Sequence, residues 1–95
     1  MYSWTQDLPI NEDVYKRIRS RLDGARLDGL IVHLAIRADD GHVRYVDVWE
    51  SEAKCEAAFE AHIHPAVFGV LGELGIRPTS EPPREPLTVL DVLFG

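Results

Sequence analysis

His33 and Asp47 form the pair of side chains in this sequence best suited to acid–base chemistry. They lie in two stretches rich in β-branched and aromatic residues, 30–37 and 43–49, and the Asp-Asp-Gly turn at 39–41 predicts a β-hairpin. A three-residue loop, with its glycine in the left-handed region as a bulge, sets His33 opposite Asp47. A carboxylate in that place orients an imidazole for proton transfer, so both residues are candidate catalytic groups. The alternative is a polar pair that is satisfied at a barrel interface.

His62 is the third candidate catalytic residue, because helical spacing turns it towards the sheet. Cys55, Ala58, Phe59 and His62 follow the i, i+3, i+4, i+7 pattern of a buried stripe. Small alanine residues along the same helix leave room beside the imidazole. We therefore expect His62 to face a ligand-sized cavity between this helix and the sheet. A core histidine bonded to a backbone carbonyl is the alternative.

Aromatic side chains that are able to stack on a planar ligand complete the candidate site. They are Trp4, Tyr45, Trp49 and Phe59. Aromatic residues in a small sheet also serve simply as core. No zinc motif accompanies the histidines, and neither a metal nor another cofactor is expected.

Hydrophobic periodicity predicts the elements that must position these residues. A strand is predicted at 2–8, and a helix capped by Asn11 should end at Gly24. Ser51 caps a second helix, which Pro65 breaks or restarts. The remaining predicted elements are a short helix at 66–74, an extended connector at 77–86 and a final strand at 87–94 that is apolar on both faces.

The hairpin register also predicts which residues share a face of the sheet, because side chains alternate along a strand. One face becomes plain aliphatic core, and the other is mixed and carries the candidate catalytic pair. The predicted pairs are Val32 with Val48 and Leu34 with Val46 on the aliphatic face, and Ile31 with Trp49, His33 with Asp47 and Ala35 with Tyr45 on the mixed face.

The element order β-α-β-β-α-β predicts an α+β, ferredoxin-like fold with an antiparallel four-stranded sheet, and 1–95 is expected to be a single domain. Two helices cover one face of such a sheet. The other face is expected to carry more contiguous apolar surface than a solvated monomer tolerates, so a second identical chain should cover it. The product would be a homodimeric α+β barrel. The residues expected on that face are Ile31, Ala35, Val43, Tyr45 and Trp49.

Composition narrows the classes of partner. Ten Lys and Arg residues against sixteen Asp and Glu residues give a formal net charge of −6, which repels nucleic-acid phosphates. The single cysteine, Cys55, cannot form an internal disulfide. No stretch reads as a signal peptide or a membrane span, so no membrane association and a reducing cytoplasmic location are expected.

The segments VDVWESE at 46–52 and AFEAH at 58–62 resemble the dimeric α+β barrel superfamily, and within it the antibiotic-biosynthesis-monooxygenase-type domains. In element order the resemblance covers nearly the whole chain, and its local motif covers 47–65. It implies a homodimer that binds its ligand between the second helix and the sheet. The haem-degrading branch typically has a Trp on this helix and a haem-ligating His after it. Those positions hold Ala57, Ala58 and Phe59 here, with Phe68 beyond them, so that branch's site is not matched.

Two functions stay open at this point. In the first, the chain is a cofactor-independent monooxygenase that positions and deprotonates a small aromatic or polyketide-like substrate. In the second, it is a non-catalytic dimeric module that binds a ligand or simply assembles. A cavity of about 300 Å³ or more between the second helix and the sheet would favour the first function. A helix packed flat on the sheet would favour the second.

Overall fold

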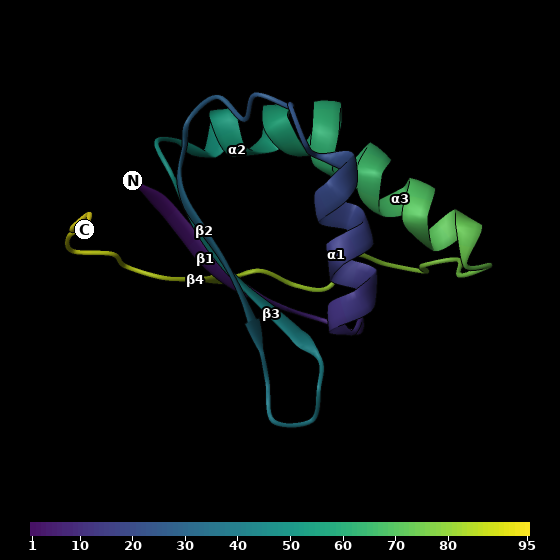
Figure 1. Ribbon diagram of the computed structural model, residues 1–95. Coiled ribbons are helices and arrows are strands. Elements are labelled where there is room, and N and C mark those ends of the chain that lie inside the picture. The colour runs from purple at the N-terminus through teal and green to yellow at the C-terminus, as the bar shows by residue number, and fades with distance from the viewer.

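The computed structural model describes all 95 residues, and it places three α-helices on one side of a four-stranded antiparallel sheet (Figure 1). The order of the strands in the sheet is β2-β3-β1-β4. This arrangement confirms the predicted α+β fold with ferredoxin-like order. The elements are β1 (Tyr2–Leu8), α1 (Glu12–Arg21), β2 (Leu30–Arg37), β3 (Val43–Trp49), α2 (Glu52–Ala58), the π-helix η1 (Phe59–Ile63), α3 (His64–Glu73) and β4 (Glu85–Pro86).

Local sequence signals fix where the first two helices begin. The Asn11 side chain accepts a hydrogen bond of 2.9 Å from the backbone N–H of Val14, which caps α1 as predicted. Ser51 caps α2 in the same way by accepting from the N–H of Lys54 at 3.2 Å. Gly24 follows α1 with φ at 81°, a conformation that glycine adopts without strain.

The hairpin turn has the predicted three-residue loop. The Gly41 N–H and the Ala38 carbonyl are 2.9 Å apart, and Ala38 donates to the His42 carbonyl at the same distance. Gly41 has φ at 92°, so the bulge conformation requires glycine there. The loop sets His33 opposite Asp47, as predicted.

The register differs from the prediction only at the far end of the hairpin. Three further pairs form as predicted, but Trp49 faces Leu30 and not Ile31. A β-bulge between Leu30 and Val32 adds one residue to β2 and shifts the pairing there. The three pairs that agree are Val32 with Val48, Leu34 with Val46 and Ala35 with Tyr45.

The prediction of which face the helices cover is wrong. Trp49 and Tyr45 are buried in the same core cluster as Phe59 and lie under the helices. Large aromatic side chains fill the gap between a sheet and helices better than short aliphatic ones do. This explains why the helices cover the face that carries Trp49 and Tyr45. The face left open is therefore the aliphatic one, where Leu34 and Ile36 are exposed.

The remaining residues expected on the open face also lie elsewhere. Val43 is buried in the aromatic core cluster, and Ile31 lines a cavity on the helix side. Ala35 is exposed although it shares the alternation of His33. Apart from the bulge near Leu30, the alternation along the strands is as predicted, and only the face that the helices cover differs.

Pro65 does not break the second helix, which runs through it as one helical arm, residues 52–73. Pro65 has no N–H to give to the preceding turn, and the turn before it widens to η1, where the N–H of His64 donates to the carbonyl of Phe59. The wider turn puts one extra residue between the buried positions. Phe59 remains buried, Ile63 packs against the same core, and His62 is exposed.

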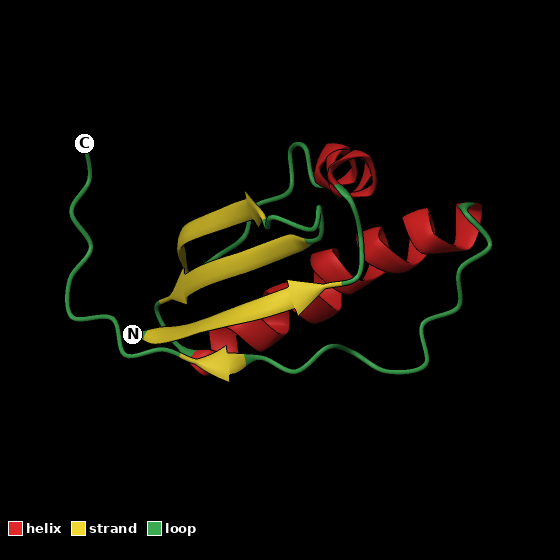
Figure 2. Ribbon diagram, turned by 90° about the horizontal axis from the view of Figure 1, so that it is seen from below, coloured by secondary structure: helices red, strands yellow, loops and turns green.

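The final strand predicted at 87–94 is wrong. Only Glu85 and Pro86 pair with β1, and Leu87 adds a single hydrogen bond of 2.9 Å to the Ser3 carbonyl. The chain then runs away from the strands as a loop (Figure 2). Leu90 and Leu93 are 91% and 93% exposed, so the chain itself leaves these apolar side chains uncovered. No helix is both long enough and apolar enough to cross a membrane.

Candidate functional site

A cavity of about 480 Å³ lies between the helix-covered face of the sheet, α1 and the loop that follows α1. We call it the His33 pocket. His33 and Asp47 line it from β2 and β3, and Phe59 and Ile63 line it from the helical arm. Most of its other lining residues are apolar. The helical arm is therefore not packed flat on the sheet along its whole length.

His33 and Asp47 form a closely bonded pair on the wall of this pocket. The His33 Nδ1 and the Asp47 Oδ1 are 2.6 Å apart, and the indole N–H of Trp49 donates to the other carboxylate oxygen at 3.0 Å. The Asp47 side chain is only 3% exposed, whereas that of His33 is 26% exposed. With Asp47 ionised, the Nδ1 of His33 carries the proton and the Nε2 keeps a lone pair.

Tyr15 of α1 holds the outer nitrogen of the imidazole. Its hydroxyl oxygen is 3.0 Å from the Nε2 of His33, and its ring stacks on the imidazole with a centroid separation of 6.1 Å. Burial raises the pKa of Tyr15, so the phenol stays protonated and donates its O–H to Nε2. The hydrogen-bonded chain thus runs from Tyr15 through His33 to Asp47.

Tyr45 packs its ring edge-on against the imidazole, with ring centroids 4.8 Å apart. Burial also raises the pKa of Tyr45, which keeps this phenol neutral. Tyr15 and Tyr45 contact each other edge to face at 5.7 Å. Two neutral aromatic rings therefore fix the plane of the His33 ring.

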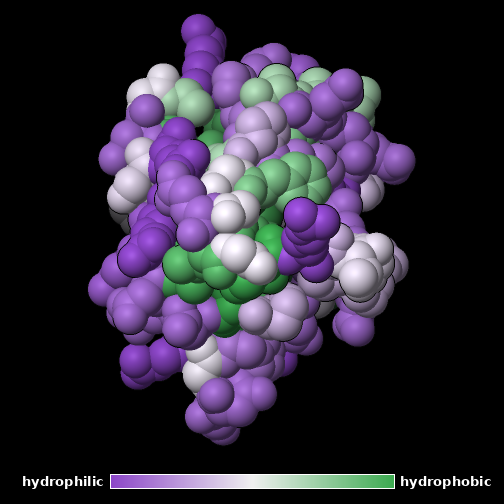
Figure 3. All heavy atoms as spheres, turned by 90° about the vertical axis from the view of Figure 1, so that its right-hand side faces the viewer, coloured by the Kyte–Doolittle hydropathy of each residue, from purple (hydrophilic) through white to green (hydrophobic).

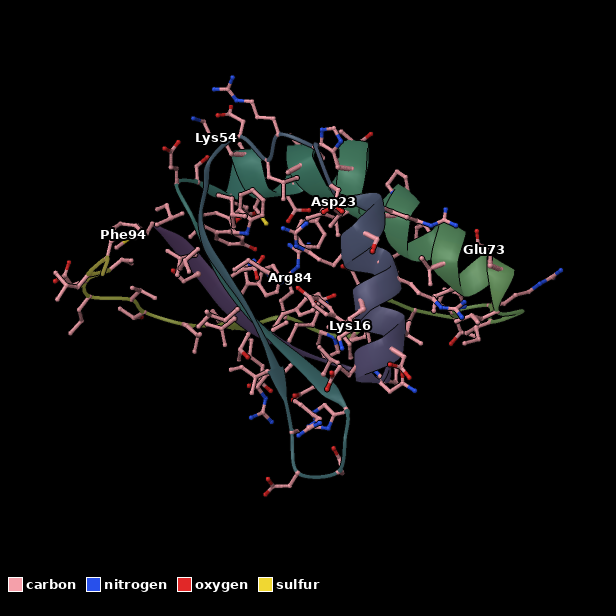
Figure 4. All side chains as sticks on the ribbon, viewed as in Figure 1. Lys16, Asp23, Lys54, Glu73, Arg84 and Phe94 are labelled. Carbon is pink, nitrogen blue, oxygen red and sulfur yellow. The ribbon has the colours of Figure 1, made fainter.

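Trp4 belongs to the same core cluster as Trp49 and Phe59 but does not reach the His33 pocket. It packs against Phe59 at 5.7 Å, and the Arg84 guanidinium lies over both rings, 4.8 Å from the Trp4 ring centroid and 4.4 Å from that of Phe59. Figure 4 shows the Arg84 side chain reaching into the space between the sheet and α2. Arg84 also pairs with Glu56. Trp4 is therefore covered by Arg84 and Phe59, and it does not line the pocket where it was predicted to stack on a ligand.

The structure thus brings five of the seven predicted site residues together around one cavity. His62 lies outside it on the exposed side of the helical arm, so the prediction that this side chain faces the cavity is wrong. Trp4 also lies outside. The five that line the His33 pocket are His33, Tyr45, Asp47, Trp49 and Phe59.

Tyr15 is the site residue that sequence reasoning missed. It lies three residues before Ile18 and seven before Leu22, so helical spacing puts it on the buried stripe of α1. That spacing, together with a polar hydroxyl on an otherwise apolar stripe, was the signal that could have identified it.

The two other histidines have partners away from the pocket. His42, beside the hairpin turn, contacts Asp7 at 2.8 Å and also bonds to Asp40, and these two carboxylates raise the pKa of its imidazole. His64 contacts Glu81 of the connector at 3.3 Å. No three His, Cys, Asp or Glu side chains cluster closely enough to hold a metal ion.

Comparison with known proteins bears on the fold. No protein-family model matches the chain, and no curated protein matches it in sequence. The chain is similar to the solved structure of Rv0793 from Mycobacterium tuberculosis, with a TM-score of 0.58, 15% sequence identity and coverage of 96% of each chain. At this identity the likeness shows a shared fold and carries no information about the reaction.

Proposed function

We propose that this chain is an enzyme that binds a small aromatic molecule in the His33 pocket and removes a proton from it, as a cofactor-independent monooxygenase would. The observation that supports this function is the bonded His33–Asp47 pair on the wall of a largely apolar cavity. A volume of about 480 Å³ is within the range of pockets that hold small ligands.

The hydrogen-bonded chain gives the proton a route out of the substrate. A hydroxyl of the substrate gives its proton to the Tyr15 oxygen as Tyr15 gives its own proton to the Nε2 of His33. The buried carboxylate of Asp47 then stabilises the imidazolium that results. Because the carboxylate is held from both sides, it needs no reorganisation when that charge appears.

Deprotonation makes the aromatic ring electron-rich enough to reduce O₂. With a quinol as substrate, one oxygen atom ends as a hydroxyl on a ring carbon, and the other leaves as water with two hydrogens of the quinol as the ring is oxidised to a hydroxyquinone. O₂ is the only co-reactant in this balance. The role of the protein is to position the substrate and to remove the first proton.

Replacing His33 with glutamine tests this function. The amide of glutamine is able to donate to Asp47 but is not a base at neutral pH, so we expect oxygen consumption with a quinol-type substrate to fall by about 10²–10⁴-fold. His62→Gln is the matched control, because His62 is exposed on the helical arm and should leave turnover unchanged. Equal rates for wild type and His33→Gln would exclude His33 as the base.

A non-catalytic ligand-binding module is the second candidate, and one observation favours it. The Tyr15 hydroxyl already occupies the Nε2 of His33, which makes the polar network complete without a substrate. In that function the network only orients a ligand. His33→Gln would then change the affinity for a quinol, and the wild-type chain would consume no oxygen with it.

We also propose that the chain works as a homodimer whose two sheets pack through their aliphatic faces. Leu34 and Ile36 are exposed on this face, and Val32 and Val46 beside them are only partly buried. The apolar segment at 87–94 leaves the body of the chain without cover of its own. A second copy would cover both surfaces through one two-fold interface.

Replacing Leu34 with glutamate should convert that dimer to a monomer. A carboxylate in the centre of an apolar interface has no partner and costs several kcal/mol. Light scattering coupled to size exclusion at micromolar concentration should give twice the chain mass for wild type and one chain mass for Leu34→Glu. The control is Leu74→Glu at the end of α3, which should stay dimeric. A monomeric wild type would contradict the proposal.

A further inference from the structure

A second cavity, of about 570 Å³, lies between α3 and the proline-rich connector. Residues 76–83 line one side of it, Val67 and Leu71 line another, and Gln6 and Leu8 of β1 lie at its inner end. Figure 3 shows hydrophobic side chains gathered at the centre of the face that carries α1 and α3, ringed by hydrophilic ones. We call this cavity the connector cavity.

The connector cavity and the His33 pocket share a wall. Four side chains line both cavities, so only one layer of side chains separates them. None of the four is charged, and three are buried whereas Ile63 is only partly buried. Ile63 is therefore the most exposed part of the wall. The shared residues are Ile18, Tyr45, Phe59 and Ile63.

The surface of the connector cavity is mainly apolar. The side-chain amide of Gln6 donates to the Pro82 carbonyl at 2.7 Å, and His64 contacts Glu81 at 3.3 Å. These two polar groups are thus spent on holding the connector in place. Further polar residues that line the cavity belong to the connector itself, and they are Arg77, Thr79, Ser80 and Glu81. What the cavity offers is apolar surface from α3, the connector and the shared wall.

We propose that the connector cavity holds the apolar extension of the same ligand whose hydroxyl is bound at His33. The substrate class would be an elongated phenol or quinol, with its ionisable ring in the His33 pocket and an alkyl chain or further rings beyond Ile63. This inference rests on the proposed function, because the hydroxyl at His33 supplies the orientation that the connector cavity cannot.

The affinity of 4-alkylphenols, measured by calorimetry from 4-ethylphenol to 4-octylphenol, tests the inference. In the wild-type chain, affinity should rise by about fourfold for each methylene that enters the connector cavity. Val67→Phe fills this cavity from α3, so it should leave 4-ethylphenol unaffected and abolish the gain from longer chains. Leu74→Phe, at the C-cap of the same helix, is the control, because Leu74 lines neither cavity.

Different results separate this inference from the function on which it rests. If the gain per methylene is the same in Val67→Phe and wild type, the extension lies elsewhere and the inference is wrong, while 4-ethylphenol binding that depends on His33 would still support the phenol site. If wild type binds no alkylphenol, or if His33→Gln binds 4-ethylphenol with the affinity of wild type, the proposed phenol site and its extension are both wrong.

A second variant guards against a folding defect in Val67→Phe. Ile76 lines the connector cavity from the connector and is 48% exposed, so Ile76→Trp fills the same space without disturbing the core. Its circular dichroism should match that of wild type. The same loss of chain-length dependence is expected, and an unchanged dependence in the folded variant would overturn the inference.

Discussion

Replacing Asp47 with asparagine is expected to slow turnover by about 10³–10⁴-fold while leaving the chain folded. The indole of Trp49 is only a donor, so the amide oxygen of the asparagine must turn towards it. The amide NH₂ then faces the Nδ1 of His33 and donates to it. The imidazole proton moves to Nε2, which becomes a donor to Tyr15 and loses the lone pair that accepts the proton.

Oxygen consumption with a quinol-type substrate measures the rate, and nitrogen-15 spectra of His33 identify which ring nitrogen carries the proton. Asp39→Asn is the matched control, since Asp39 is exposed in the hairpin turn and has no part in the network. We expect the control to keep both the rate and the tautomer of wild type. A full rate in Asp47→Asn together with an Nε2-protonated His33 would show that the tautomer does not control the reaction.

Replacing Trp49 with alanine should have the largest effect on stability, lowering the free energy of unfolding by about 3–5 kcal/mol. The side chain is fully buried, so its removal leaves a cavity in the aromatic core. It also removes the N–H that binds the second oxygen of Asp47, which leaves a buried carboxylate oxygen without that partner. This loss is a large fraction of the total stability of a small domain.

Urea unfolding followed by circular dichroism measures the change. Trp49→Phe separates the two causes, because it keeps most of the ring volume and lacks the N–H; we expect it to cost about 1–3 kcal/mol. Leu74→Ala, at the exposed end of α3 and outside the proposed dimer interface, is the control and should change the unfolding midpoint little. If Trp49→Ala and Leu74→Ala had similar midpoints, Trp49 would not be part of the core.

The hairpin was predictable because its turn chemistry leaves little choice. Only the three-residue loop through Gly41 keeps apolar residues opposite apolar ones, and this loop alone places His33 beside Asp47. The candidate catalytic pair was therefore readable from turn residues and alternation. The bulge near Leu30 was not, since a single extra residue next to a pocket leaves no sign in the hydrophobic pattern.

The choice of face could not be read from the pattern. Alternation tells which residues share a face, but both faces of this hairpin are largely apolar, and the helices were free in principle to cover either. Packing decides it, because Trp49 and Tyr45 are long enough to meet Phe59 across the gap. Because the other face was expected to be covered, the predicted dimer interface fell on residues of the core, and Tyr15 was not recognised as a partner of His33.

His62 was misplaced because the spacing rule assumes a constant 3.6 residues per turn. Pro65 signals a disturbance, but its position does not tell whether the helix ends, kinks or widens. The structure widens the turn, and Ile63 takes the inward position expected for His62. The final strand at 87–94 was also predicted wrongly. An apolar segment indicates that another surface covers it, but it does not identify that surface.

The five-residue turn of η1 constrains how the lengths of related sequences are able to change. Before this turn, Cys55 and Ala58 belong to the core cluster on the sheet, and after it Ala66 and Val70 pack with Ile18 of α1. Deleting one residue from η1 would close the wide turn to an ordinary α-helical turn and keep both apolar faces in place, whereas a deletion within α3 would rotate the residues beyond it by about 100°. Descendants of this chain are thus free to shorten the arm by a single residue at η1 but not elsewhere along it.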